Sequence, residues 1–234
     1  LQKEFCDPLP WLAGDVAALN QGGDAVRFDG GVVCFGLSDR QEPVGLAPSL
    51  SGAAPVLTPQ GYRRADQLCA GDLVQDVDGH AHPIRFSTQR DVPARGRFRP
   101  LRLRAPFLGL RRDVIVAPEQ RLIVRGPEVE YLFGEERVLV EAQALVGTNC
   151  AVPADCAATV RYHQLVLDDH TMLDVAGLPM ESLFIGDLRE TPEMLATTVL
   201  RNAPANSLPL HKKLACPVLR AYEAVTLCAA LFSR

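Results

Sequence analysis

The sequence predicts a mainly β fold, with a compact antiparallel domain over residues 49–187 and a helical appendage at the C-terminus. Three observations lead to this prediction. Short β-branched runs alternate with Gly, Pro and Asp turns roughly every eight to twelve residues. Apolar residues take helical spacing only after Gly186. The chain has 234 residues, which is enough to bury a sizeable core.

The N-terminal residues, 1–48, are rich in Gly, Pro and Asp and predict an arm that contains a strand or two. In the β domain that follows, TPQG and DVDGH supply turn chemistry through Pro and Asp-Gly, and YRRADQL predicts a short helical turn at most. Further strands are expected at RPLRLRAP, RDVIVAP, RLIVRG, RVLVEAQAL, VRYHQLVLD and TMLDVAG.

The C-terminal tail, residues 188–234, has a different pattern. Its segments TPEMLATTVLRNA and PVLRAYEAVTLCAALFS carry apolar residues at helical spacing. Thr191 and Pro192 supply a cap and first-turn pair. We therefore expect most of the helices in this tail, packed on the β domain.

Composition argues against several classes of function. A hydrophobic share of 47% and a charged share of 22% are those of an ordinary globular protein. The net charge of −4 argues against nucleic-acid binding, which needs clustered Lys and Arg to neutralise phosphates. No apolar run reaches the roughly 18 residues of a transmembrane helix, so no membrane partner is expected.

Cysteine and histidine spacing predicts neither a metal nor another cofactor. The seven cysteines are odd in number and lack C-x-x-C spacing, which favours reduced thiols in a cytoplasmic protein. Secretion as part of a larger polypeptide remains the alternative. His80 and His82 flank a hairpin turn, and without a nearby carboxylate or thiol they predict a solvated turn.

Four blocks in order carry a resemblance to a known family. They are VLTPQGYRRADQLCAGDLVQDVDGHAHPIRF, VAPEQRLIV, EYLFGEERVLVEAQALV and VRYHQLVLDDHTMLDVAGLPMES. They resemble bacterial Hint domains, the fold that hedgehog autoprocessing domains and inteins share. That family has a Thr-Pro-x-Gly turn leading to Gly-Asp-x-Val, then Ser/Thr-Pro-x-His-Arg, Leu-Val-x-Ala-x-x-Leu, and Tyr-x-His…His…Ala-x-Gly…Glu-Ser. The first motif matches Thr58, Pro59, Gly61, Leu68, Gly71, Asp72 and Val74.

The resemblance covers residues 49–187 and implies a Hint-type fold with self-cleavage chemistry. In that chemistry a nucleophile attacks the carbonyl before it and converts a peptide bond into an ester or thioester. Counting back from Thr58 places Ser49 at the nucleophile position. Gln120 falls where the family has the histidine that protonates the departing amide nitrogen. The histidine of the last block is retained as His170, with Asp168 two residues before it.

Two of these positions lack the family's usual chemistry. A serine hydroxyl needs a base to become a nucleophile. Glutamine cannot transfer protons near neutral pH, although Gln120 can still donate a hydrogen bond to a carbonyl. General acid–base help is worth roughly 10²- to 10⁴-fold in rate. The sequence therefore predicts a degenerate autoprocessing domain, catalytically inactive, that acts as a structural or binding module.

Several alternatives stay open at this point. One is an active acyl shift at Ser49, and another uses Cys34, because Cys34-Phe35 also resembles the family's nucleophile motif. A third is a small β-barrel binding module unrelated to Hint. Intein-type splicing is disfavoured, since no terminal His-Asn pair precedes a Cys, Ser or Thr. A fused or neighbouring protein domain is the partner we expect.

These interpretations imply a specific geometry. Ser49, Gln120 and His170 should converge at one cleft, since the family brings its blocks together there. Asp72 should be at least half-buried and should accept hydrogen bonds from backbone amides of its turn.

Other side chains have structural interpretations beside the functional ones. Tyr162 and His163 are expected to pack within a strand. His170 could be a turn residue whose ring is satisfied by Asp168. Glu181 and Ser182 resemble a family-typical pair, but a structural turn is the interpretation we favour for that pair.

Overall fold

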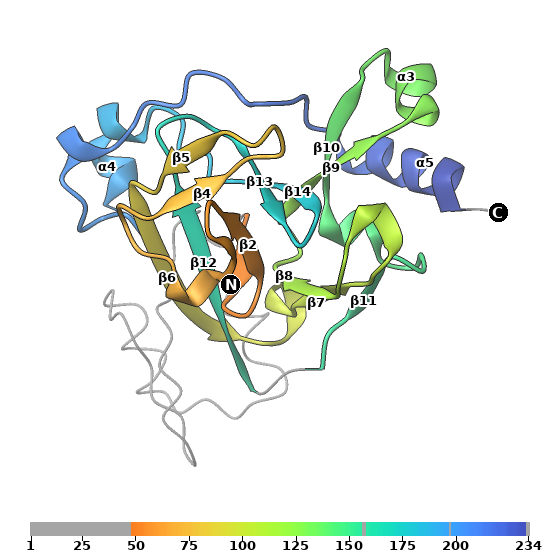
Figure 1. Ribbon diagram of the computed structural model, residues 1–234, viewed down its shortest axis with the longest axis horizontal. Helices are drawn as coiled ribbons and strands as arrows, with labels where there is room; N and C mark the ends of the chain where they lie inside the picture. The colour runs from red at the N-terminus through yellow and green to blue at the C-terminus, as the bar shows by residue number, and fades with distance from the viewer. Residues whose placement is uncertain (1–47, 156–157, 197, 233–234) are drawn as a thin grey trace.

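The computed structural model describes residues 48–155, 158–196 and 198–232 (Figure 1). Cys34 and all but the last residue of the predicted N-terminal arm lie outside these ranges. The described chain is built mainly from antiparallel strands, and its longest helix lies at the C-terminus. The predicted fold class is therefore confirmed.

Two six-stranded sheets and one hairpin make up the β domain. The first sheet has the order β11-β7-β8-β1-β12-β6, with bounds Ala151–Pro153, Leu101–Leu103, Val114–Val116, Leu50–Ser51, Thr159–Val166 and Phe86–Pro93. The second has the order β10-β9-β14-β13-β2-β3, with bounds Arg137–Glu141, Arg121–Arg125, Leu178–Glu181, Met172–Val175, Pro55–Thr58 and Gly61–Arg64. The hairpin consists of β4 (Leu73–Gln75) and β5 (Ala81–Pro83).

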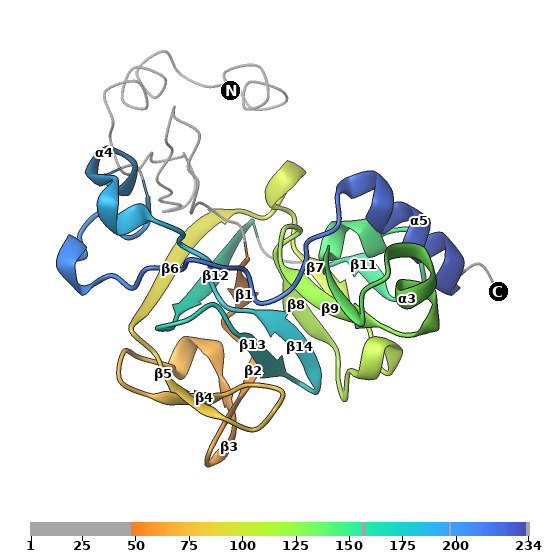
Figure 2. The ribbon, with the colours of Figure 1, turned by 90° about the horizontal axis from the view of Figure 1, so that it is seen from above.

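Helical segments are short and connect or cover the strands. The α-helices are α3 (Pro127–Phe133), α4 (Pro192–Leu195) and α5 (Ala221–Phe232). The 3₁₀ helices are η1 (Ala65–Gln67), η2 (Gly96–Phe98), η3 (Phe107–Gly109), η4 (Ala142–Leu145), η5 (Leu188–Glu190) and η6 (Ala205–Ser207). Helix α5 lies against α3 and η4 at one end of the molecule (Figure 2). None of the helices in the described ranges is long and apolar enough to cross a membrane.

Strand β9 shows how alternation builds the core. Successive side chains of a strand point to opposite faces. Leu122 and Val124 enter the main core, whereas Ile123 enters a smaller cluster with Cys216 of the tail. Helix α5 adds Leu227, which is fully buried, to the main core. The tail therefore packs on the β domain, because the strands present apolar side chains on both faces.

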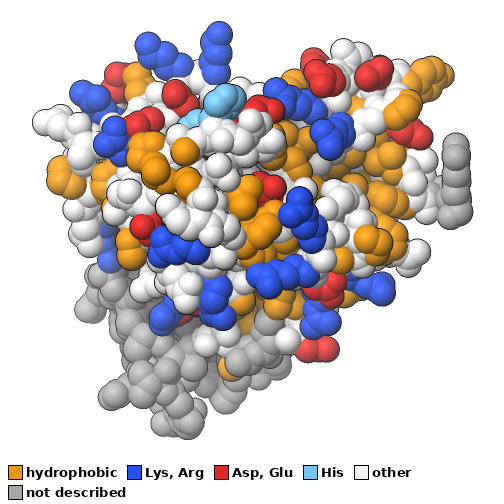
Figure 3. All heavy atoms as spheres, in the orientation of Figure 1, with side chains coloured by type: hydrophobic (Ala, Val, Ile, Leu, Met, Phe, Trp, Pro, Cys, Tyr) orange, Lys and Arg blue, Asp and Glu red, His pale blue; other side chains and the backbone are white. Residues whose placement is uncertain are grey.

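The outer face seen in Figure 3 carries Lys and Arg side chains interspersed with Asp and Glu, with hydrophobic side chains between them. Neither sign of charge forms a continuous stripe on this face. This pattern is typical of an ordinary protein surface.

Two turns of the first family block are held by their own side chains. Thr58 Oγ1 donates to Gly61 O at 2.6 Å and accepts from Gln60 N at 3.2 Å. Gly61 takes a φ of +104°, a region that disfavours side chains. Asp72 is half-buried, and its Oδ2 accepts from Cys69 N at 2.9 Å. The predicted capping role of Asp72 is therefore confirmed.

Three sequence-based expectations differ from the structure. Helix α3 was not predicted within the β domain, although Pro127 at its first position and Gly134 in the left-handed conformation mark its ends. The expected strand RVLVEAQAL ends at Glu141 and continues as η4. TPEMLATTVLRNA forms only the short helix α4, because Thr198 Oγ1 bonds to Leu195 O and to Leu200 N and turns the chain.

Candidate functional site

Strand register places Ser49 beside a glutamine. In β1, Leu50 pairs with both Val116 and His163. Continuing the β1–β12 register by one residue puts Ser49 opposite Gln164, and Gln164 Nε2 donates to Ser49 Oγ at 3.0 Å. Ser49 is 0% exposed. The hydroxyl at the expected nucleophile position therefore receives a hydrogen bond from an amide.

Gln120 lies in the turn between β8 and β9, close to the Ser49 backbone. Ala117 N donates to Ser49 O, and Gln120 N donates to Ala117 O, both at 3.0 Å. The buried Gln120 side chain donates from Nε2 to Arg121 O at 3.0 Å and to Glu181 O at 3.2 Å. An amide has two N–H groups, so both are used by fixed carbonyls.

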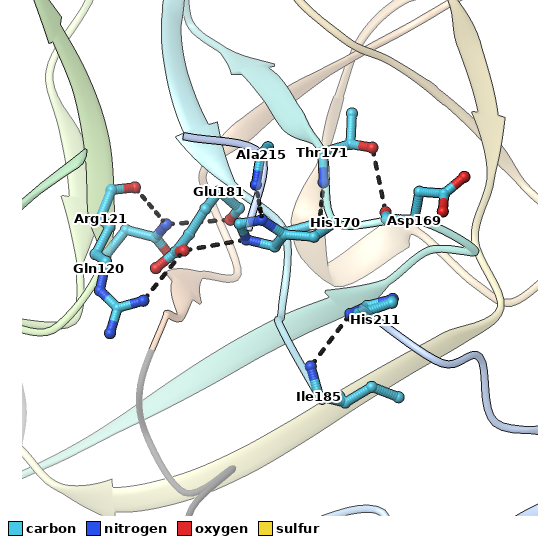
Figure 4. A network of polar contacts seen from close by, with 10 residues as sticks. Gln120, Arg121, Asp169, His170, Thr171, Glu181, Ile185, His211 and Ala215 are labelled. Carbon is cyan, nitrogen blue, oxygen red and sulfur yellow. Dashed lines mark hydrogen bonds and ion pairs between the residues drawn. The ribbon is translucent and has the colours of Figure 1, made fainter. Parts of the chain in front are cut away.

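His170 is held by one partner at each ring nitrogen (Figure 4). Ala215 N donates to His170 Nδ1 at 2.9 Å, and His170 Nε2 lies 3.1 Å from Glu181 Oε2. Because Ala215 N–H can only donate, Nδ1 must accept, and the ring proton lies on Nε2. The His170 N–H therefore donates to the Glu181 carboxylate. Both side chains are fully buried.

Gln120 and His170 meet at Glu181, one at its backbone carbonyl and the other at its carboxylate. Arg121 Nη1 lies 3.4 Å from the same Glu181 Oε2. Ser49 joins this cluster through Ala117. Glu181 thus links the Gln120 and His170 side chains, and the backbone of Ala117 links Ser49 to them. Their catalytic role stays a prediction.

Asp168 lies outside this network. Its carboxylate forms an ion pair with Arg85, and its side chain is 48% exposed. The interpretation that Asp168 satisfies the His170 ring is therefore wrong, since Glu181 and Ala215 occupy both nitrogens. The expectation that Glu181 belongs to a structural turn is also wrong, because it ends strand β14. Glu181 therefore takes the role that the sequence interpretation gave to Asp168, that of acidic partner of His170.

Gln164 was missed in the sequence interpretation. Counted from Tyr162, the Tyr-x-His pattern places Gln164 at its histidine position, and His163 at its middle position. That spacing was the available signal. Tyr162 and His163 do pack within strand β12, as expected, and both are buried. Burial lowers the pKa of His163 below its ordinary value.

The C-terminal tail covers the network through a second histidine. Ile185 N donates to His211 Nδ1 at 3.2 Å, and His211 Nε2 lies 3.1 Å from Leu167 O. The His211 ring is 6.4 Å from that of His170, centroid to centroid. Burial lowers the pKa of His211 below its ordinary value. Two neutral histidines thus accept backbone N–H groups where the tail meets the β domain.

The hairpin histidines also differ from expectation. Asp76 Oδ2 lies 2.8 Å from His82 Nε2 and 3.4 Å from His80 Nδ1. The expectation that these histidines lack a nearby carboxylate is therefore wrong. The closed hairpin brings Asp76, at the end of β4, alongside β5.

Comparison with known proteins identifies the family through a sequence profile. The sequence profile of the Hint domain family matches residues 48–187. Among solved structures, a bacterial intein-like domain from Clostridium thermocellum is 13% identical, with a TM-score of 0.41 over 58% of this chain and 98% of that chain. The MchDnaB-1 intein is 15% identical, with a TM-score of 0.37 over 57% and 98%. Comparison with curated protein sequences gives no match. Because the profile match spans more than half of the chain, this protein belongs to the Hint domain family.

Proposed function

We propose that this Hint domain no longer cleaves itself and serves as a structural or binding module. The observation that carries the proposal is the hydrogen bond from Gln164 Nε2 to Ser49 Oγ. Self-cleavage would require a group that removes the Ser49 hydroxyl proton. Gln164 cannot take that proton, because an amide nitrogen offers no basic lone pair.

Gln120 cannot protonate the departing group either. Attack of Ser49 Oγ on the Pro48 carbonyl carbon would form an ester and break the Pro48–Ser49 C–N bond. The Ser49 nitrogen must then gain a proton. Gln120 stands at the family's acid position, but both of its N–H groups are bonded to the carbonyls of Arg121 and Glu181. An amide does not release a proton near neutral pH.

His170, the histidine retained from the family's last block, is engaged as well. His170 donates one N–H to Glu181 and accepts one from Ala215, which leaves neither nitrogen for a reacting group. Freeing its basic nitrogen would require the tail to leave. The retained buried network instead ties strand β14, the β8–β9 turn and the tail together. This supports a role in which the domain works as a stable body.

Intact mass spectrometry of the full chain tests the proposal. The chain is incubated for a day near neutral pH with hydroxylamine and dithiothreitol, beside the matched variant Ser49→Ala. We expect both proteins to keep their full mass. A fragment ending at Pro48 that appears in the unmodified chain and not in Ser49→Ala would overturn the proposal. A fragment ending before Cys34 would overturn it in favour of the alternative nucleophile.

A further inference from the structure

The β4–β5 hairpin gathers Asp and His side chains that can bind a metal ion. Val74 pairs with His82 and Gln75 with Ala81, so the two strands are in fixed register. His80 and His82 lie on either side of Ala81, and alternation places such neighbours on one face. Asp76 N donates to His80 O at 3.0 Å, which closes the hairpin beside them.

Asp76 is held in a defined orientation. Its Oδ1 accepts from Asp78 N at 2.9 Å and from His80 N at 2.8 Å. Its side chain is only 10% exposed. With Oδ1 fixed by two amides, Oδ2 faces His82 Nε2 at 2.8 Å and His80 Nδ1 at 3.4 Å. Outer hydrogen bonds of this kind orient metal ligands.

Asp78 completes the group. Ligand atoms of Asp76, Asp78 and His80 all lie within 4.8 Å of one another. Tetrahedral ligands at about 2.0–2.2 Å from a zinc ion lie roughly 3.4 Å apart. The separation between His80 Nδ1 and Asp76 Oδ2 already matches this spacing. His82 lies outside this group of three, although its Nε2 is 2.8 Å from Asp76 Oδ2, and its ring would have to reorient to join as a fourth ligand.

The chemistry of the four side chains selects the class of ion. Two imidazoles and two carboxylates suit zinc-class divalent transition metals, whereas Ca²⁺ and Mg²⁺ prefer all-oxygen sites. The two aspartates balance the charge of a divalent ion when both histidines are neutral. We propose that Asp76, Asp78 and His80, joined by His82 on binding, form a binding site for a zinc-class divalent ion.

Such an ion would reinforce a part of the fold that lies outside the two large sheets. The hairpin belongs to neither six-stranded sheet, and its backbone joins β13 through the Asp76–Leu173 bridge. Binding at the hairpin would tie its two strands together beside that bridge. This inference does not depend on whether Ser49 is reactive.

Calorimetric titration of the full chain with ZnCl₂ tests the site. We expect a single ion per chain at the hairpin. His80→Gln is the first variant, since this side chain is 74% exposed and its loss should not disturb folding. Asp76→Asn keeps the shape of the turn and removes a ligand charge. Both should weaken binding by roughly tenfold or more. The control Cys69→Ser removes an exposed thiol and should leave binding unchanged.

Cobalt supplies a second readout. Titration with CoCl₂ should give a visible absorption spectrum of tetrahedral type that His80→Gln abolishes. The proposal is overturned if the unmodified chain takes up no zinc. Binding that survives both His80→Gln and Asp76→Asn would also overturn it. So would binding lost in Cys69→Ser, because the ligand would then be a thiol. Equal affinity for MgCl₂ would overturn the class of ion.

Discussion

The Thr58–Asp72 segment and the network around Ser49 belong to the same family match, yet the two regions differ in how closely their residues follow the family's motifs. In the first, Thr58 and Asp72 keep the family's residues and bond to backbone groups of their own turns. In the second, glutamines occupy positions 120 and 164, which the motif resemblance aligns with histidines. The comparison separates what the fold requires from what the chemistry requires.

The physical basis is the difference between hydrogen bonding and proton transfer. A buried polar group must be hydrogen-bonded, and an amide meets that need. Gln120 bonds two carbonyls and Gln164 bonds the Ser49 hydroxyl. Neither amide titrates near neutral pH. An amide at such a position can therefore satisfy buried hydrogen-bonding groups without supplying an acid or a base.

Placing a thiol at position 49 and histidines at positions 120 and 164 should make the Ser49 region follow the family's motifs as closely as the Thr58–Asp72 segment does. The triple variant Ser49→Cys, Gln120→His, Gln164→His should release an N-terminal fragment in the presence of dithiothreitol. A thiol is the better nucleophile, and acid–base assistance is worth roughly 10²- to 10⁴-fold. Intact mass spectrometry measures the fragment.

The control for this experiment is Ser49→Cys alone. It should cleave far more slowly than the triple variant, because its leaving group still lacks a proton donor. Equal rates in the two variants would contradict the assignment of proton transfer to positions 120 and 164.

Within the Ser49 network, stability should depend most on Glu181. Glu181→Leu removes the partner of the buried His170 N–H and of Arg121, and we expect a loss of roughly 3 kcal/mol in the free energy of unfolding. Glu181→Gln should cost less, since its amide oxygen can still accept from His170. Urea denaturation compares the two variants. Equal losses of unfolding free energy in the two variants would show that the shape of the side chain, and not its hydrogen bond to His170, determines the loss of stability.

In the turn region, Asp72→Ala should cost about 1–2 kcal/mol, as the loss of other capping side chains does. The reason is that Cys69 N–H loses its acceptor. The same bond holds the pKa of Asp72 below its ordinary value. Thermal or urea denaturation measures the change. Asp155→Ala is the control, because that side chain is 99% exposed and should change stability by less than about 0.5 kcal/mol. If Asp72→Ala leaves the melting curve unchanged, the stabilising role of this cap is contradicted.

The smallest effect we expect is a pH dependence from His211. Burial lowers its pKa, so the unfolded chain binds its proton at higher pH than the folded chain does. The stabilisation is complete above about pH 6.5 and is lost as the pH falls toward the folded pKa. Urea denaturation at about pH 7.5 and about pH 5.5 should show weaker stability at the lower pH.

His211→Leu should reduce this slope without removing it, because the pKa of His163 is also lowered by burial. A slope that His211→Leu leaves unchanged would place the pH dependence elsewhere.

Local patterns predicted much of the fold. Alternation located the strands that became β7, β8, β9, β12 and β13. Helix α3 was missed because seven residues carry little periodicity, although Pro127 and Gly134 marked its ends. In the site, motif spacing gave Ser49, Gln120 and His170, and a stricter count from Tyr162 would have added Gln164.

By itself the sequence determined the mainly β architecture, the capped turns and the amide at position 120, because turn chemistry and side-chain alternation act over a few residues. Tertiary structure decided which side chains are hydrogen-bonded to one another in the site. His170 bonds to Glu181, eleven positions away, and not to Asp168, because the β12–β6 pairing draws Asp168 toward Arg85. Ser49 bonds to Gln164 through the register of β1 against β12. Such pairings depend on strand register and chain crossing, which sequence proximity does not reveal.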